Sequence, residues 1–140
     1  MVTVRPRTFT YAVTLDRDRA ATSDRGGAVL VDDESAWTPE HLLLTALARC
    51  VLTSLDHHAE RAGVTAASTA AAAGKVTRRE TDQRFAFVEI DVECTVELDP
   101  PLEPDSAREL VAKAERDCFV AASLAVVPRY RWIFDGEPLA

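Results

Sequence analysis

The most constraining feature of the chain is a long segment, Phe85 to Asp99, in which apolar and polar side chains alternate. A period of two residues is typical of a β-strand, because successive side chains point to opposite faces of the sheet. One face of this strand would therefore pack in a core while the other meets water. The residues predicted to face the core are Ala86, Val88, Ile90, Val92, Cys94, Val96 and Leu98, and the carboxylates between them would face solvent.

A second strong pattern predicts a long helix from Thr38 to about Gly63. Thr38 is a suitable N-cap, Pro39 suits the first helical position because it lacks an N–H group, and the carboxylate of Glu40 is favoured near the positive end of the helix dipole. Residues 42–48 are apolar nearly all round the helix, which is typical of a buried helix. In a chain of 140 residues, complete burial of such a helix is hard to achieve alone.

The remaining patterns complete an α+β fold, which we predict to be a single domain over residues 1–140. Pro104-Asp105-Ser106 starts a second, amphipathic helix that has Cys118 near its end. The Ala-rich stretch 64–76 is ambiguous between helix and strand, and we favour a strand with Gly74 at a bend or bulge. The other predicted strands are 8–16, 20–24 and 28–32, which form a short meander, and 130–134, which follows a helical segment over 120–126.

Composition argues against several classes of protein. The net charge is -7 and the arginines are scattered, so binding of nucleic acid is not expected. No apolar run approaches the ~20 residues that span a bilayer, and residues 1–7 lack the apolar stretch of a signal peptide. Three cysteines, at positions 50, 94 and 118, are too few and too far apart for a disulfide framework. We therefore expect a protein of a reducing, cytoplasmic compartment.

Cys50 lies well inside the predicted helix, whose dipole cannot activate it. At 1.5 Å per residue it is ~18 Å from the helix start, beyond the reach of the dipole that lowers the pKa of many reactive thiols. Adjacent Arg49 points about 100° away around the helix, so a more distant cation would be needed. A cysteine in an apolar helix more often packs as a small hydrophobe. The second helical cysteine, Cys118, and the sequences around both favour chemistry instead.

Two segments resemble those that carry cysteines in a known family. Residues 38–50, TPEHLLLTALARC, resemble the helix with the reactive cysteine of the OsmC/Ohr family, the osmotically inducible and organic hydroperoxide resistance proteins. Residues 118–124, CFVAASL, are similar to the segment that holds the family's second cysteine. The order of strands and helices agrees over nearly the whole chain. The resemblance implies an OsmC-like fold, in which antiparallel sheets pack around a long central cysteine-bearing helix in an intertwined homodimer.

The resemblance also implies an activity, that of a thiol-dependent peroxidase for organic hydroperoxides that works without a metal or organic cofactor. Cys50 would be the peroxidatic thiolate, which becomes a sulfenic acid, and Cys118 would resolve it as a disulfide. A dithiol, either lipoyl-type or thioredoxin-like, would then reduce that disulfide.

The family further uses an arginine from the N-terminal strands and the glutamate of its Pro-Glu motif. Glu40 matches the glutamate, and the arginine is Arg17 in our preferred alignment or Arg19 in the next. The guanidinium would hold Cys50 as a thiolate, and the carboxylate would hold the guanidinium. Because Glu40 and Cys50 are ~15 Å apart along one helix, we infer that a shared site would combine two protomers of a homodimer. In the competing interpretation, Glu40 only stabilises the helix start.

Some residues depart from the family pattern. Phe119 stands where proline usually follows the second cysteine, and residues 33–37 replace the glycines common before the Pro-Glu motif, which points to a divergent OsmC-like member. The alternative function is a non-catalytic dimer of the same fold that binds an apolar ligand or senses redox state. A cysteine hydrolase is disfavoured because no histidine stands at a plausible position. His57 and His58 lack a metal-binding context, and we expect a surface or interface role for them.

Overall fold

The computed structural model describes residues 6–140, and the chain divides into two compact units. The first ends at Leu42 and the second runs from Leu43 to Ala140. The expectation that the chain lacks a signal peptide concerns residues 1–7, of which 1–5 lie outside the described part. That expectation and the assignment of a single domain remain predictions. Among the described residues, no helix is long and apolar enough to cross a bilayer.

The first unit contains an antiparallel sheet of three strands in the order β1-β2-β3, which confirms the predicted meander. Its strand β1 is shorter than predicted because the pairing with β2 extends over residues 13–15. The carboxylate of Asp16 accepts backbone hydrogen bonds from Asp18 and Ala20 at 2.9 Å each, which closes the turn between β1 and β2. The elements are β1 (Val13–Leu15), β2 (Ala20–Ser23), β3 (Ala28–Leu30) and a following 3-10 turn, η1 (Asp33–Ser35).

Helix α1 (Pro39–Arg61) begins where the sequence predicts and continues from the first unit into the second. The Thr38 hydroxyl oxygen accepts a hydrogen bond from the His41 backbone N–H at 3.2 Å and lies 2.7 Å from His41 Nδ1. This cap satisfies one of the N–H groups that the first helical turn leaves without helical partners. After the helix, Gly63 adopts a left-handed conformation (φ 77°), which is common directly beyond a C-terminus.

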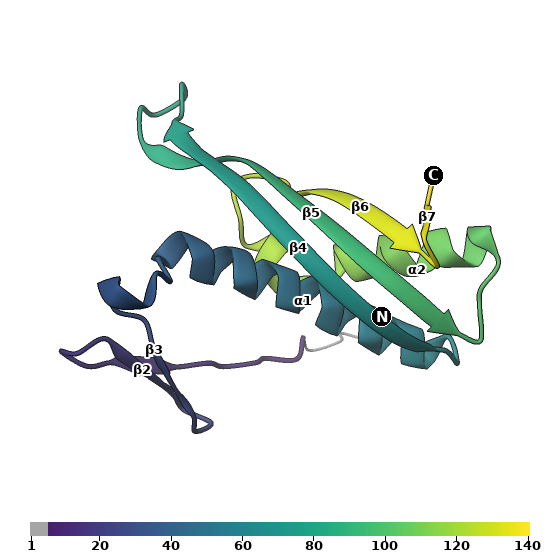
Figure 1. Ribbon diagram of the computed structural model, residues 1–140, viewed down its shortest axis with the longest axis horizontal. Helices are drawn as coiled ribbons and strands as arrows, with labels where there is room; N and C mark the ends of the chain where they lie inside the picture. Colours follow the sequence, from purple (N-terminus) through teal and green to yellow (C-terminus); the bar gives the residue numbers. More distant parts are fainter. Residues whose placement is uncertain (1–5) are drawn as a thin grey trace, which may run out of the picture. The chain divides into compact units, whose positions relative to one another are not determined.

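The second unit contains a four-stranded sheet in the order β4-β5-β6-β7 (Figure 1). Strands β4 (Thr65–Arg78) and β5 (Phe85–Asp99) form a long antiparallel hairpin, so the Ala-rich stretch is a strand and β5 has the bounds of the alternating segment. The other elements are α2 (Pro104–Arg116), α3 (Phe119–Ala122), β6 (Arg129–Phe134) and β7 (Glu137–Pro138).

The prediction of antiparallel sheets is wrong for one pair of strands. Strand β6 pairs with β5 in parallel, from Asp91 opposite Arg129 to Val96 opposite Phe134. The chain leaves β5, passes through α2 and α3, and enters β6 in the same direction, because a crossover of this length can carry it back along the sheet. The second unit therefore contains a mixed sheet in an α+β arrangement.

The core of the second unit lies between one face of the sheet and helices α1 and α2 (Figure 1). From Ile90 to Leu98 the inward side chains of β5 are buried and the carboxylates between them are exposed, which confirms the predicted alternation there, whereas Ala86 and Val88 are only half-buried. Removal of this apolar surface from water is the main driving force for folding of the unit. The larger buried core residues are Leu47, Val51 and Leu55 of α1, Ile90, Val92 and Val96 of β5, Leu110 of α2 and Trp132 of β6.

Within this chain, α1 buries one face and leaves others open. Its buried residues recur at spacings of three and four, which is typical of a helix with one core face. Residues 42–44 are half-buried, and Thr45 and Ala46 are exposed. The predicted burial all round the helix is therefore not reached by one chain. The buried set is Leu47, Val51, Ser54, Leu55 and Ala59.

Gly74 permits a close approach of a neighbouring side chain. The ring of Phe87 in β5 occupies the space into which a side chain at position 74 would project. The pairing register of β4 and β5 shifts between Lys75 and Val76. The irregularity predicted at Gly74 thus lies just beyond it, and the glycine itself makes room for the ring.

Candidate functional site

Cys50 lies in the middle of α1, at the border of the buried face of that helix. It stands three residues after the fully buried Leu47, and residues at this spacing are neighbours on a helix surface. The side chain of Cys50 is half-buried. Its thiol is therefore beside the core but still within reach of a small reagent.

Cys118 lies between α2 and α3 and is fully buried (0% exposed). Asp117 is the C-cap of α2, and Cys118 adopts an extended conformation (φ -80°, ψ 108°) as the N-cap of α3. We call Asp117 and Cys118 the α2–α3 junction. The sequence predicted Cys118 near the end of the amphipathic helix, whereas the structure places it just after that end, where the backbone has left helical geometry.

The structure brings the thiols of Cys50 and Cys118 together, and both are free cysteines. The pKa of Cys118 is raised to about 11, first by burial and then by a hydrogen bond with Cys50 and the charge of that thiol. The backbone amides of Ala121 and Val120 act in the opposite direction. Cys118 therefore stays protonated at neutral pH and lies beside the more accessible Cys50.

Cys94, the third cysteine, faces the core from β5, as the alternation predicts. Burial raises its pKa to about 12, and the charges of Glu115 and Glu93 add to this effect. A thiol that is enclosed and protonated packs as a small apolar side chain. Its burial and its raised pKa both argue against a nucleophile's role for Cys94.

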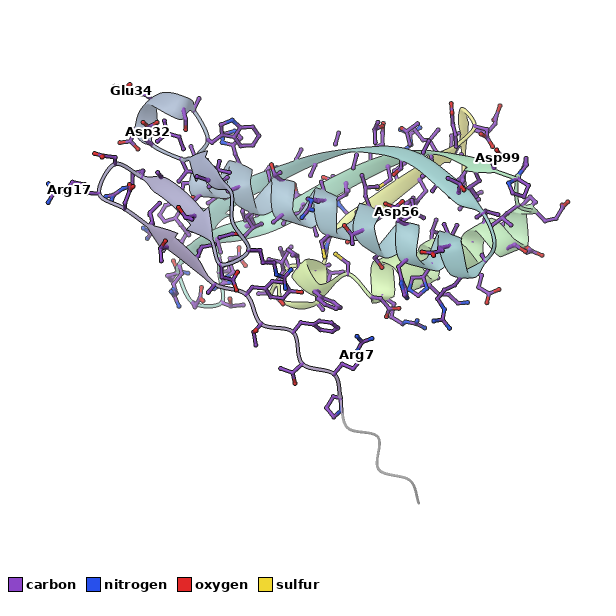
Figure 2. The ribbon with its side chains drawn as sticks, turned by 90° about the horizontal axis from the view of Figure 1, so that it is seen from below. Arg7, Arg17, Asp32, Glu34, Asp56 and Asp99 are labelled. Atoms are coloured by element: carbon purple, nitrogen blue, oxygen red, sulfur yellow. The ribbon has the colours of Figure 1, made fainter. Side chains whose placement is uncertain are left out.

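The predicted arginines and glutamate lie in the first unit. Arg17 and Arg19 are exposed in the turn between β1 and β2, and Figure 2 shows the Arg17 side chain pointing outward from the end of this hairpin. Arg19 adopts a left-handed conformation (φ 65°), which such hairpin loops require at their last position. Glu40 is exposed in the first turn of α1. Since the two thiols belong to the second unit, the roles of these three residues remain predictions.

A histidine for which the sequence predicts only a surface or interface role contacts Asp117, the residue before Cys118. His58 Nε2 donates to Asp117 Oδ2 at 2.7 Å, and this hydrogen bond joins α1 to the α2–α3 junction. His57 is exposed and meets the His58 ring edge-on, with the ring centres 5.0 Å apart. Among residues 6–140, no three His, Cys, Asp or Glu side chains are grouped so as to hold a metal ion. No motif in the sequence relates His58 to Asp117, because their contact depends on how α2 packs.

Tyr130 also lies near the thiols. Its hydroxyl is buried and finds no hydrogen-bond partner in the part of the chain that the structure describes. Burial, followed by the charges of Cys118, Glu115, Cys94 and Cys50, raises the pKa of Tyr130 far above its ordinary value. Its place in an alternating strand predicts an inward side chain, but no local signal relates it to cysteines distant in sequence.

The family model of OsmC-like proteins matches residues 32–130 of the chain. The chain belongs to the OsmC-like family. The matched region contains Glu40, Cys50 and Cys118, whereas Arg17 and Arg19 precede it. Among proteins with curated functions, none matches the sequence significantly.

Solved structures of OsmC-like proteins share the fold. An OsmC-like protein of unknown function from Vibrio cholerae is 14% identical with a TM-score of 0.73, covering 91% of this chain and 100% of its own. An organic hydroperoxide resistance protein from Elizabethkingia anophelis is 16% identical with a TM-score of 0.69, covering 94% and 100%. The organic hydroperoxide resistance protein OhrB of Bacillus subtilis is 24% identical with a TM-score of 0.57, covering 91% and 98%. At these identities the likeness establishes the fold and leaves the activity open.

Proposed function

We propose that this OsmC-like chain is a thiol-dependent peroxidase that reduces organic hydroperoxides, with Cys50 as the peroxidatic and Cys118 as the resolving cysteine. The observation that carries the proposal is the contact between a half-buried thiol and a fully buried one that are distant in sequence. A peroxidatic thiol must be reachable by the peroxide, while a resolving thiol needs only to reach its partner. The two cysteines meet these two requirements in that order.

The proposed reaction has two steps at sulfur. The Cys50 thiolate attacks the distal oxygen of the hydroperoxide, so that an S–O bond forms, the O–O bond breaks, and the alkoxide leaves and takes a proton to become an alcohol. The Cys118 sulfur then attacks the sulfenic sulfur of Cys50 as its own proton departs. The S–O bond breaks, hydroxide leaves as water, and a disulfide remains. A dithiol, lipoyl-type or thioredoxin-like, returns the two electrons.

The raised pKa of Cys118 supports the assignment of Cys50 as the peroxidatic and Cys118 as the resolving cysteine. A thiolate is the nucleophilic form of cysteine, so a thiol whose pKa is about 11 competes poorly for peroxide at neutral pH. Once Cys50 carries a sulfenic acid, proximity compensates for the small thiolate fraction of Cys118, because the attack is intramolecular.

The activating cation in this proposal comes from the first unit, as Arg17 or, second in preference, Arg19, and Glu40 holds its guanidinium. The dipole of α1 cannot serve, because Cys50 lies ~18 Å from the start of that helix. Glu40 and Cys50 stand on one continuous helix ~15 Å apart, so each site would draw on both protomers of an intertwined homodimer. The reducing, cytoplasmic compartment expected from the sequence would keep both thiols ready to react.

The proposed substrate class is organic because an apolar side chain follows Cys118 directly. Phe119, directly after Cys118, is 55% exposed and offers apolar surface for an alkyl chain. Organic hydroperoxide resistance proteins are among the similar structures, which supports the same class.

Rapid mixing of the reduced protein with cumene hydroperoxide, followed by thiol counting and mass mapping, tests the proposal. We expect two thiols per chain to be lost as a disulfide between Cys50 and Cys118. Cys50→Ser should abolish the reaction, Cys118→Ser should stop it at the sulfenic acid, and Cys94→Ala should preserve it. A rate no greater than that of free cysteine would contradict the peroxidase. The non-catalytic dimer, which binds an apolar ligand or senses redox state, would then remain.

A further inference from the structure

The α2–α3 junction is attached to α1 at two points. Cys118 of the junction meets Cys50, and its neighbour Asp117 accepts the hydrogen bond from His58. Cys50 and His58 are ~12 Å apart along α1, about two turns, whereas Asp117 and Cys118 are adjacent in the chain. A segment held at one point can pivot, but a segment held at two points has both its position and its direction fixed.

The contact between His58 and Asp117 has the features of a stable hydrogen bond. The His58 side chain is 11% exposed, and at 2.7 Å the hydrogen bond is short. Arg116 donates from Nε and Nη2 to the same carboxylate at 2.9 Å each. The pKa of Asp117 is consequently held far below its ordinary value, first by Arg116 and also by His58. Asp117 therefore remains an ionised acceptor across the physiological pH range.

The two partners of Asp117 differ in what they connect. Arg116 is its direct neighbour in the chain, so that pair orders the junction without attaching it to another element. His58 belongs to α1, the helix that carries Cys50. Of these two contacts, the one from His58 therefore sets where the junction lies along α1.

We propose that His58 is a positioning residue for the resolving step, which holds the α2–α3 junction through Asp117 so that the Cys118 sulfur stays beside Cys50. This inference rests on the function proposed above. It predicts that loss of the hydrogen bond leaves the first attack at Cys50 unchanged and slows closure of the disulfide. Slower closure would also leave the sulfenic acid exposed longer to a second peroxide, which oxidises it to sulfinic acid.

The test uses the aromatic disulfide dithiobis(nitrobenzoate) and needs no peroxide. The Cys50 thiolate attacks one sulfur of the reagent, and the first thionitrobenzoate anion leaves with the electron pair of the broken S–S bond. Cys118 then attacks the Cys50 sulfur of the mixed disulfide, its proton passes to solvent, and the second thionitrobenzoate leaves. The coloured anion reports both phases. The second phase is first-order and measures how well Cys118 is positioned.

Three variants of the full chain separate the hydrogen bond from other effects. His58→Leu removes the donor and keeps an apolar side chain of similar bulk, whereas His58→Gln retains a donor nitrogen at a similar distance from the backbone. Arg116→Ala is the matched control, because it also deletes a partner of Asp117 but leaves the contact with α1 intact. Circular dichroism and thermal unfolding identify any variant that fails to fold.

We expect His58→Leu to slow the second phase about tenfold, the scale set by a hydrogen bond to a charged group, with the first phase unchanged. His58→Gln should recover most of the rate, and Arg116→Ala should keep it within about twofold of the wild-type protein. Equal second phases in wild type and His58→Leu would overturn the proposal, and so would a failure of His58→Gln to recover when it folds normally. If the wild-type protein forms the disulfide with this reagent but not with cumene hydroperoxide, the proposed peroxidase function is contradicted and the positioning role of His58 is retained.

Discussion

The three cysteines differ in how much of each side chain water can reach. Cys94 and Cys118 are fully buried, with pKa values raised to about 12 and about 11, whereas Cys50 is half-buried. Periodicity predicted the inward direction of Cys94, because a strand's faces follow from its own sequence. The contact of Cys50 with Cys118, and that of His58 with Asp117, depend on packing between elements, so no local pattern could supply their geometry.

The hydroxyl of Tyr130 should cost stability. It is buried without a hydrogen-bond partner among the described residues, and a polar group in that position loses its interactions with water. We predict that Tyr130→Phe raises the free energy of unfolding by about 1 kcal/mol in urea titrations. Tyr11→Phe, at a side chain that is 64% exposed, is the control and should change it little. A clear loss of stability in Tyr130→Phe would show that the hydroxyl is bonded in solution.

The charge of Asp117 gives stability a defined dependence on pH. Its pKa is lowered on folding, so its contribution is present above the unfolded value of about 4 and is lost as pH falls below that value. Asp117→Asn should therefore be less stable than wild type at pH ~7, with the difference shrinking below pH ~4.

Asp56 on α1, labelled in Figure 2, is the control, because folding shifts its pKa in the opposite direction to that of Asp117. Burial raises its pKa, so its ionised form is disfavoured in the folded protein. Asp56→Asn should gain stability near neutral pH and lose that gain as pH falls. Urea titrations across this pH range check both variants. A pH-independent difference for Asp117→Asn would contradict the account.

At the scale of elements, the strongest local signals located α1 and β5. A proline at the first helical position and a threonine before it predicted the start of α1, and the alternation from Val88 to Asp99 predicted most of β5. The parallel pairing of β6 with β5 escaped prediction, since it depends on the route of the chain through α2 and α3. The spacing of Cys118 continues the apolar stripe of α2 and so predicts this cysteine near the end of the helix, but the helix ends at Arg116 and Cys118 lies just beyond it.

The cap of α1 can be tested by replacing a threonine with alanine at two positions, at the N-cap and inside the helix. Thr38→Ala removes the oxygen that accepts from the His41 N–H, and we predict a loss of about 1 kcal/mol in the free energy of unfolding. Thr53→Ala, where the exposed hydroxyl donates to the Arg49 carbonyl inside the helix, should be neutral or slightly stabilising, because alanine favours a helix interior. Similar losses in the two variants would contradict a capping role for Thr38.

At the scale of the whole molecule, the proposed site requires more than the second unit provides. The thiols lie in the second unit, whereas Arg17, Arg19 and Glu40 lie in the first. Within one chain, residues 42–46 of α1 also form a surface that is not fully covered. Leu42 to Leu44 are half-buried there, and Thr45 and Ala46 are exposed. A second copy of the chain could cover this surface and bring Glu40 to the Cys50 of its partner, which the sequence alone suggested from the length of the helix.

Mixing of two inactive variants tests the shared site. Chains with Cys50→Ser and chains with Glu40→Ala, unfolded together and refolded, should form heterodimers that each contain one intact site. With random pairing, about a quarter of the wild-type peroxidase activity should return. Activity that stays at the level of the separate variants would place Glu40 and Cys50 of one site in the same protomer, or leave Glu40 as a residue of the helix start alone.

The most direct test of the central claim is the second-order rate constant for oxidation of Cys50 in the Cys118→Ser, Cys94→Ala variant, measured with cumene hydroperoxide and with hydrogen peroxide. In this variant Cys50 is the only thiol, so sulfenic acid formation can be followed by intact mass after trapping. The account predicts that cumene hydroperoxide reacts at least ~10²-fold faster than it does with free cysteine, the lower range of gain from a positioned catalytic group, and faster than hydrogen peroxide does with the protein. Rates equal to those of free cysteine with both peroxides would contradict it.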